Sequence, residues 1–374
     1  MWFRGNAVGA AMVTAILTAC ASPSEDAERY SASIIYGEDH RREYFETDTS
    51  SATIMATSVV ALIPKAYIKT NPGGLWLRSP TWRESSGVCA HEPFSAQPAA
   101  AFCSGVLVDW DLVLTAGHCV RQFALNDFLI AFGYYYRTPD RLALSSGDLY
   151  EPVEIASEEL NPPGWEPRLD YAWLRLAQPV RAPRRPAAVQ LGQPALKNSE
   201  AVVTYGTPGG VPGKSDAGGK IRDARLSVGD FFLADTDTSY GCSGGGAFVQ
   251  DGTLLGILAR GGMDLVTSPA GCRVTFHEPD GSITSEQFTY VHRAVEGLCK
   301  TGGESSLCRP DCGNPCLALP PTEIGGCAVT PRGSGTAALA GPILLALVAI
   351  LVPITGRPLR APRRGARSGP SVRP

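Results

Sequence analysis

Two short segments of this sequence contain residue types that can carry out acyl transfer. They are Thr115-Ala116-Gly117-His118-Cys119 and, much later, Gly241-Cys242-Ser243-Gly244-Gly245. A serine hydroxyl is a weak nucleophile at neutral pH, so it needs a base within hydrogen-bond reach and a third group that fixes the tautomer of that base. The two segments therefore predict His118 as the base and Ser243 as the nucleophile.

An aspartate between the two segments is predicted to be the third group. Asp170 comes directly before a mostly apolar run at 171–176, which places its carboxylate at the start of a buried strand. There it would orient the imidazole of His118 and stabilise its cationic form. Asp140 and Asp148 lie among turn-forming residues and are predicted to be solvated.

Residues next to these segments are predicted to position them. The glycine-rich turn lets a substrate approach the main chain, so the N–H groups of Gly241 and Ser243 are the predicted donors to an oxyanion. Cys103 and Cys119 are predicted to form a disulfide that holds the loop carrying His118.

The pattern Gly241-x-Ser243-x-Gly245 leaves a second enzyme class open. It also fits the nucleophile elbow of an α/β-hydrolase, which would be an esterase. That fold needs a parallel sheet with helices and a catalytic histidine after the serine. The sequence has little helical periodicity and no fitting histidine segment, which disfavours this class.

The composition favours a β-rich protein that folds outside the cytoplasm. The chain has 374 residues with 11 Cys, 41 Gly and 30 Pro, and disulfides persist in oxidising compartments. Its formal net charge is -3 and its Lys and Arg residues are scattered, so nucleic acid is not an expected partner.

The N-terminus is predicted to be a secretory signal at 1–19. Arg4 precedes an apolar run at 7–17 that is too short to cross a bilayer. The segment Leu17-Thr18-Ala19-Cys20 resembles the bacterial lipobox, which predicts lipidation of Cys20 and a polar tether at 20–33. The alternative is an ordinary signal peptide in which Cys20 has no such role.

The C-terminal part is predicted to anchor the protein in a membrane. Residues 301–333 are rich in Gly, Pro and Cys, which predicts a disulfide-tied stalk rather than a zinc site. Its cysteines are Cys308, Cys312, Cys316 and Cys327. An apolar segment at 334–356 is long enough to span a bilayer, and the basic tail at 357–374 would stay in the cytoplasm. This arrangement resembles the sorting signals of myxobacterial surface proteins, and a plain membrane anchor is the alternative.

Between the two ends, residues 34–300 are predicted to form an all-β domain. Short β-branched and aromatic runs alternate with Gly, Pro and Asp clusters, and helical periodicity becomes clear only at 290–295. The clearest strands are expected at 58–63, 102–108, 112–115, 128–132, 172–176, 201–205 and 254–258. A Pro- and Arg-rich stretch at 178–186 is the expected crossover between two six-stranded antiparallel Greek-key barrels, with the active site in the cleft and a C-terminal helix.

The segments around His118, Asp170 and Ser243 resemble the three catalytic segments of trypsin-like serine proteases. The flanking similarity is to the bacterial branch of glutamyl endopeptidases, and it lies at 34–41, 89–103, 206–214 and 237–238. The resemblance implies a serine endopeptidase that forms an acyl-enzyme, acts on proteins or peptides and needs no cofactor or metal. A catalytically silent homologue that serves as a surface binding module is the alternative. The family resemblance and the two terminal signals together predict a monomer anchored at the bacterial cell envelope, with its catalytic domain outside the cytoplasm.

Cys242 departs from the pattern of this family. Trypsin-type enzymes have an aspartate there that pairs with a new N-terminal ammonium, and the bacterial branch usually has asparagine. A thiol cannot form that ion pair, so we expect activity without it. Cys242 could instead be the nucleophile, as in the chymotrypsin-like cysteine proteases of viruses, but Tyr240 then occupies the place of an expected glycine. A disulfide between Cys242 and Cys272 is the preferred prediction.

The specificity pocket is predicted from the same resemblance. Asp237 and Thr238 lie where trypsin-like enzymes place residues that select the substrate side chain. Ala259, Arg260 and Gly261 are expected to form the pocket wall and to bind the substrate main chain as an edge strand. The histidine of glutamate-selective enzymes is absent from this wall. Arg260 is expected to point to solvent, and the alternative is that it favours acidic substrate side chains.

Overall fold

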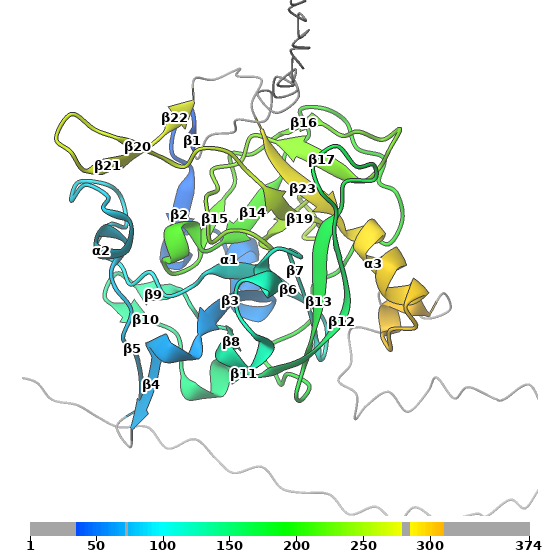
Figure 1. Ribbon diagram of the computed structural model, residues 1–374, viewed down its shortest axis with the longest axis horizontal. Helices are drawn as coiled ribbons and strands as arrows, with labels where there is room; N and C mark the ends of the chain where they lie inside the picture. The colour runs from blue at the N-terminus through cyan, green and yellow to red at the C-terminus, as the bar shows by residue number, and fades with distance from the viewer. Residues whose placement is uncertain (1–34, 72–73, 279–284, 310–374) are drawn as a thin grey trace, which may run out of the picture. The chain divides into compact units, whose positions relative to one another are not determined.

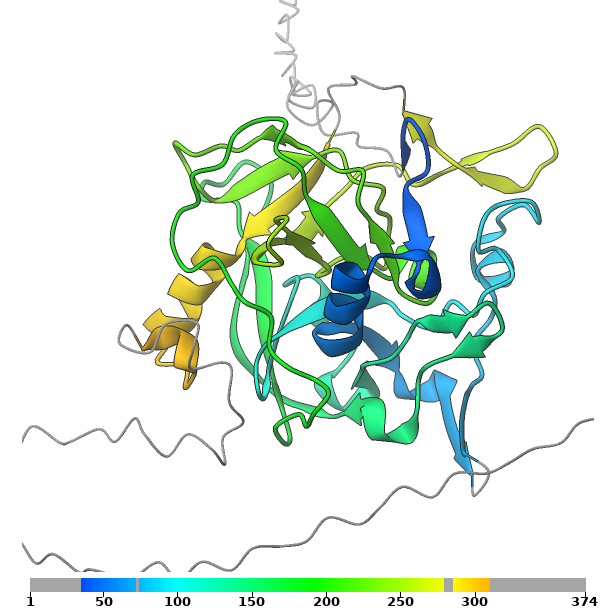
Figure 2. The same ribbon diagram turned by 180° about the vertical axis from the view of Figure 1, so that it is seen from behind.

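Two curled β-sheets form the framework of the part of the chain that the structure describes (Figures 1 and 2). The computed structural model describes residues 35–71, 74–278 and 285–309. The predicted signal peptide, the lipidation site Cys20, the tether, most of the stalk, the apolar segment and the basic tail lie outside these residues. Among the described residues, no helix combines the length and the apolar character needed to cross a membrane.

The first sheet has seven strands, all of them paired antiparallel. In spatial order they are β11 (Leu149–Tyr150), β8 (Phe128–Ala131), β3 (Val59–Pro64), β6 (Cys103–Asp109), β7 (Leu112–Thr115), β13 (Asp170–Leu176) and β12 (Pro152–Leu160). The five strands predicted in this half correspond to β3, β6, β7, β8 and β13. Their β-branched and apolar residues are buried, which is why the pattern was readable.

The second sheet has eight strands and is also antiparallel. In spatial order they are β16 (Ile221–Asp223), β17 (Phe231–Ala234), β23 (Glu286–Tyr290), β19 (Leu254–Arg260), β18 (Gly246–Phe248), β14 (Val203–Gly206), β15 (Lys214–Asp216) and β2 (Arg41–Glu43). The strands predicted at 201–205 and 254–258 correspond to β14 and β19. The expected crossover at 178–186 contains no strand.

The sheets therefore contain seven and eight strands instead of the predicted six each. The additional strands include β11 and the polar strand β2, which lie at sheet edges. They are too short to show the alternation of apolar and polar residues that predicts a strand. Smaller two-stranded pairs complete the fold. They are β1 (Ile35–Tyr36) with β22 (His277–Glu278), β4 (Ile68–Asn71) with β5 (Gly74–Leu77), β9 (Tyr136–Thr138) with β10 (Arg141–Leu142), and β20 (Leu265–Thr267) with β21 (Arg273–Thr275).

Three α-helices lie among the described residues: α1 (Thr49–Thr57), α2 (Trp82–Ser86) and α3 (Val291–Lys300). Helix α3 is the predicted C-terminal helix, and Val291, Ala294 and Leu298 repeat at helical spacing on its buried face. Helix α1, in front of the sheets in Figure 2, was not predicted. It begins at Asp48, whose carboxylate accepts the N–H groups of two following serines.

Strand β13 connects two cores, which explains its nearly continuous apolar sequence. Tyr171 and Trp173 face the cluster between the two sheets, where α3 also packs, while Ala172 and Leu174 face the interior of the first sheet. Alternate side chains of a strand point to opposite faces, so both faces of β13 are buried. Trp173 also donates its indole N–H to the carbonyl of Ala294 in α3, at 2.9 Å.

The folded part of the chain continues beyond the boundary predicted at residue 300. Cys308 forms a disulfide with Cys299 of α3, and Leu307 is buried in the cluster between the sheets. Of the four cysteines assigned to the stalk, Cys308 therefore closes the end of the β-rich domain. Cys312, Cys316 and Cys327 lie outside the described residues.

Candidate active site

His118 and Asp170 meet because neighbouring strands bring them to the same edge of the first sheet. Strand β7 ends at Thr115, β13 begins at Asp170, and the antiparallel register pairs Thr115 with Ala172. Nδ1 of His118 lies 2.9 Å from Oδ2 of Asp170, and the His118 main-chain N–H donates to Oδ1 at 3.1 Å. Asp170 is 1% exposed, so water does not compete for these bonds. The contact places a proton on Nδ1 and leaves Nε2 as the acceptor.

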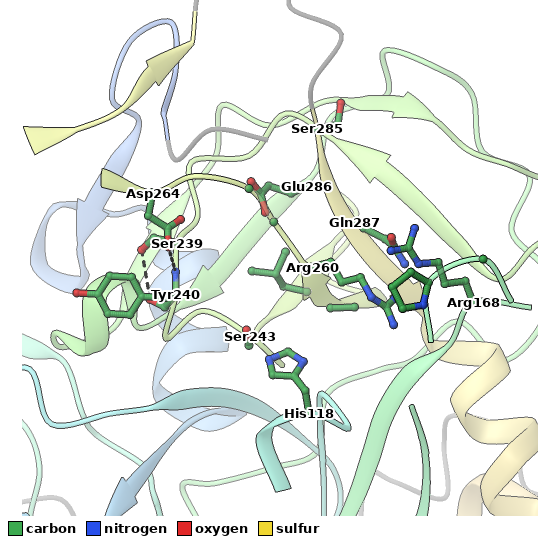
Figure 3. A pocket seen from close by; sticks show the side chains of 16 residues that line it. His118, Arg168, Ser239, Tyr240, Ser243, Arg260, Asp264, Ser285, Glu286 and Gln287 are labelled. Carbon is green, nitrogen blue, oxygen red and sulfur yellow. Dashed lines mark hydrogen bonds between the residues drawn. The ribbon is translucent and has the colours of Figure 1, made fainter. Parts of the chain in front are cut away.

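Ser243 lies beside the imidazole of His118 (Figure 3). Its carbonyl accepts the main-chain N–H of Ser104 on β6 at 2.8 Å, and Gly244 donates to the carbonyl of Leu258 on β19 at 2.8 Å. Because β6 and β19 belong to different sheets, the turn is held from both sides. The turn continues into strand β18 and not into a helix, which is incompatible with the nucleophile elbow of an α/β-hydrolase.

The main chain around Gly241 leaves two N–H groups available for an anion. The carbonyl of Tyr240 accepts the N–H of Gly209 at 2.8 Å, and in a trans peptide the N–H of Gly241 must point the opposite way. Within the described part of the chain, neither this N–H nor that of Ser243 has an acceptor. Gly241 has a φ of 87°, and a Cβ there would clash with the carbonyl of Thr207, so the site requires glycine.

Ser104 and Thr207 were not recognised from the sequence, although both hold this turn. Their hydroxyl groups each donate to the carbonyl of Gly241 at 2.8 Å. Both side chains are buried, and the two hydroxyls are also 2.9 Å from each other. Ser104 directly follows Cys103 in the sequence, and no local motif distinguishes it from an ordinary strand residue.

One of the two predicted disulfides is confirmed and the other is wrong. Cys103 and Cys119 form the disulfide beside His118. Cys272 pairs with Cys89 and not with Cys242, which is a buried free thiol packed against Gly206. Burial raises the pKa of the Cys242 thiol to about 12, so it stays protonated. A buried neutral thiol is a poor nucleophile, which argues against Cys242 in that role.

A cavity of about 670 Å³ opens beside His118 and Ser243 (Figure 3). Three predicted wall residues, Ala259, Arg260 and Gly261, line it. The predicted selectivity residues Asp237 and Thr238 do not. The cavity has further polar side chains that sequence reasoning missed, and these are Arg168, Ser239, Tyr240, Asp264, Ser285, Glu286 and Gln287. They come from four separate loops and strands that only the fold brings together.

Arg260 does not point to solvent as predicted. Its Nη2 donates to the carbonyl of Asn161 at 3.1 Å and lies 3.8 Å from Oδ2 of Asp170. The register between β19 and β23 shifts between Leu258 and Arg260, and such a bulge redirects the following side chain. Arg260 thus lies against the carboxylate that holds His118.

Asp237 binds the beginning of the described chain. Its Oδ1 accepts the N–H of Tyr36 at 2.9 Å and its Oδ2 accepts the N–H of His40 at 2.7 Å. Its own N–H donates to Asp216 at 2.8 Å. Burial is the main reason that the pKa of Asp237 is raised to about 7, with repulsion from Asp216 second. Both carboxylates are used for structure and are already bound by main-chain N–H groups.

The pKa of Asp237 predicts how stability depends on pH. Between about pH 4 and 7 the folded protein binds a proton at Asp237 that the unfolded chain releases, so this residue makes the free energy of unfolding fall as pH rises. Asp237→Asn should remove the contribution of this residue to the pH dependence of the free energy of unfolding. Because the amide has only one acceptor oxygen, the variant also loses one main-chain hydrogen bond, and this loss does not change with pH. Thermal unfolding of both proteins from pH 4.5 to 7.5 measures this. We expect the wild type to lose at least about 1 kcal/mol more than the variant over this range. If the free energies of unfolding of the two proteins changed equally with pH, the raised pKa of Asp237 would be contradicted.

Two groups of side chains come close enough to be considered as metal ligands among the described residues. One consists of Cys103, His118 and Cys119, and the other of His40, Asp216 and Asp237. The two sulfurs of the first group are joined in a disulfide. In the second group the aspartates accept the main-chain N–H groups already described. Neither group provides a free set of donor atoms.

Comparison with known proteins finds one family match, which covers the segment that contains this site. Residues 103–257, less than half of the chain, match the family described as a trypsin-like peptidase domain, and the match contains His118, Asp170 and Ser243. No curated protein matches the chain. The similar solved structures include the VesB protease of Vibrio cholerae (16% identity, 70% of this chain, 68% of that chain, TM-score 0.43) and the active form of the Rv3671c protease of M. tuberculosis (15%, 69%, 86%, TM-score 0.39). At such values neither likeness assigns a role to any residue.

Proposed function

We propose that this protein is a serine endopeptidase that hydrolyses peptide bonds through an acyl-enzyme. The observation that carries the proposal is the 2.9 Å contact between His118 and the buried Asp170, together with the cavity that His118 and Ser243 both line. The match of residues 103–257 to a trypsin-like peptidase domain supports the same class. The antiparallel sheets and the strand after Ser243 disfavour an α/β-hydrolase esterase.

The proposed reaction uses side chains and main-chain groups of the chain itself. Nε2 of His118 takes the proton of Ser243 while Oγ attacks the carbonyl carbon of the scissile bond. The oxyanion accepts the N–H groups of Gly241 and Ser243, and Asp170 stabilises the imidazolium. His118 then donates its proton to the leaving amine, and the acyl-enzyme remains. In the second half, His118 takes a proton from the water that attacks the ester carbonyl, and it then returns this proton to Oγ of Ser243 as the carboxylic acid leaves.

We also propose that the enzyme works outside the cytoplasm, at the cell envelope. Three disulfides among the described residues support this location, because disulfides persist in oxidising compartments. Anchoring through Cys20 and the apolar segment at 334–356 stays a prediction from the sequence. So does the monomeric state.

Labelling with a fluorophosphonate separates this enzyme from a silent homologue that only binds partners. The full-length protein, purified in detergent, should incorporate about one equivalent at Ser243, since only an activated serine reacts quickly. Ser243→Ala should abolish labelling. Cys242→Ala is the matched control and should keep it, because Cys242 does not line the cavity. A folded wild-type protein that takes up no label would overturn the catalytic proposal.

A further inference from the structure

The peptide between Gly241 and Cys242 separates the two main-chain N–H groups that the proposed reaction uses as oxyanion donors. One donor belongs to Gly241 and the other to Ser243, so the rotation of this middle peptide sets the direction of one donor relative to the other. Gly241 has a φ of 87°. Glycine rotates more freely than any other residue, so the two donors keep a common direction only if surrounding groups hold the peptide between them.

Two buried hydroxyl groups hold the carbonyl of this middle peptide. The hydroxyl oxygens of Ser104 and Thr207 each lie 2.8 Å from the carbonyl oxygen of Gly241, and they lie 2.9 Å from each other. Each hydroxyl has one proton, so in any arrangement at least one of them donates to Gly241. At the other end of the peptide, the N–H of Cys242 donates to the carbonyl of Ser239 at 2.9 Å. The peptide is therefore bound at both ends.

The two hydroxyls come from different sheets. Ser104 is on β6 of the first sheet, and Thr207 directly follows β14 of the second. Oγ of Ser104 accepts the main-chain N–H of Thr207 at 3.0 Å, which fastens the two segments to each other. The main-chain N–H of Ser104 donates to the carbonyl of Ser243 at 2.8 Å. Ser104 therefore contacts the carbonyl groups of both residues whose N–H groups are the donors.

The turn at 207–210 also holds the peptide that precedes Gly241. The N–H of Gly209 donates to the carbonyl of Tyr240 at 2.8 Å, which fixes the opposite direction for the N–H of Gly241. A Cβ at Gly209 would overlap the indole of Trp82, so this turn packs without room to shift. The direction of the first donor thus depends on the same turn that carries Thr207.

We propose that Ser104 and Thr207 are positioning residues that keep the N–H groups of Gly241 and Ser243 in their reactive direction before a substrate binds. The inference rests on the proposed function, because it concerns the transition state of the same reaction. Donors that are fixed in advance stabilise a developing negative charge without reorganisation. The carbonyl oxygen of a bound substrate carries less charge than the oxyanion, so the two hydroxyls should act mainly on the transition state.

The test removes the two hydroxyls with little change in shape. For the full-length protein in detergent, Thr207→Val and Ser104→Ala should each lower kcat for a fluorogenic peptide by about tenfold. The two together should lower it by about 100-fold, which is the loss expected for one missing donor. KM should stay within about threefold, because binding of the ground state does not need the donors. Thr207→Ser, which keeps the hydroxyl, should keep kcat within about threefold of the wild type.

The matched control is Thr57→Val in α1. Thr57 is also buried, and its hydroxyl also donates to a main-chain carbonyl, that of Thr53, at 2.8 Å. This variant should lose stability but keep kcat within about twofold. Thermal unfolding of each variant measures the loss of stability separately. Variants at 104 and 207 that unfold at a lower temperature but keep their kcat would overturn the proposal, and so would a raised KM at unchanged kcat. Should the double variant fail to fold, the single variants and Thr207→Ser provide the same comparison.

Fluorophosphonate labelling keeps this proposal separate from the proposed function. The phosphonyl oxygen of the bound label takes the place of the oxyanion, so the double variant should be labelled at least about tenfold more slowly than the wild type. A wild type that is labelled at Ser243, with a double variant labelled at the same rate, would overturn the positioning role and leave the enzyme class intact. A folded wild type that takes up no label would overturn the proposed function, on which this inference rests.

Discussion

Replacing Ser243 by alanine should lower kcat by about 10⁶-fold, because it removes the only atom that forms the acyl-enzyme. The alanine keeps the main-chain N–H, so the two predicted donors to the oxyanion stay in place. A residual rate about 10³-fold above the uncatalysed reaction is therefore expected. Single-turnover hydrolysis of a fluorogenic peptide measures the loss. Thermal unfolding of the same sample verifies that the fold is unchanged.

A double variant tests whether Ser243 and His118 act together. His118→Ala should cost nearly as much as Ser243→Ala, and combining both should add little, because each loss alone disables the same step. Additive losses would mean that the two residues serve separate functions. A Ser243→Ala protein with more than about 1% of wild-type kcat would contradict the assignment of the nucleophile.

The elements that position the site were predictable because they are long and apolar. Strand β13 is buried on both faces, so its sequence is nearly continuously apolar, and the one carboxylate at its start stood out. The same holds for β7, whose end places His118. Asp170 was predicted from its place at the start of this strand alone, and the antiparallel pairing of β13 with β7 that brings it to His118 is seen only in the structure.

The complete wall of the cavity could not be predicted, because it depends on contacts between distant segments. Glu286 is a polar residue at the start of a strand, and its place in this wall appears only when Gly261 lies against it. Asp237 was predicted as a selectivity residue from the resemblance to trypsin-like enzymes, but its carboxylate accepts the main-chain N–H groups of Tyr36 and His40. The Cys89–Cys272 disulfide joins residues 183 apart, and sequence spacing contains no information about such a pairing.

Replacing Asp170 by asparagine should lower kcat by about 10⁴-fold with little change in structure. Asparagine can turn its amide nitrogen toward Nδ1 of His118, which would move the imidazole proton to Nε2. The imidazole could then no longer accept the proton of Ser243. Loss of the carboxylate also removes the charge that stabilises the imidazolium and the ion-pair partner of Arg260. Hydrolysis of the same peptide from pH 6 to 10 measures the effect.

The matched control for this prediction is Asp140→Asn. Asp140 is an exposed loop residue that lies between His118 and Ser243 in the sequence, and its carboxylate accepts a hydrogen bond from the hydroxyl of Thr138. This variant should keep kcat within about twofold, since exposed substitutions of this kind have small effects. If Asp170→Asn kept kcat within tenfold, Asp170 would be a structural residue that merely holds the loop through the main-chain N–H of His118. In that case Asp170→Asn should lower the unfolding temperature while leaving the pH profile of kcat unchanged, which separates the two roles.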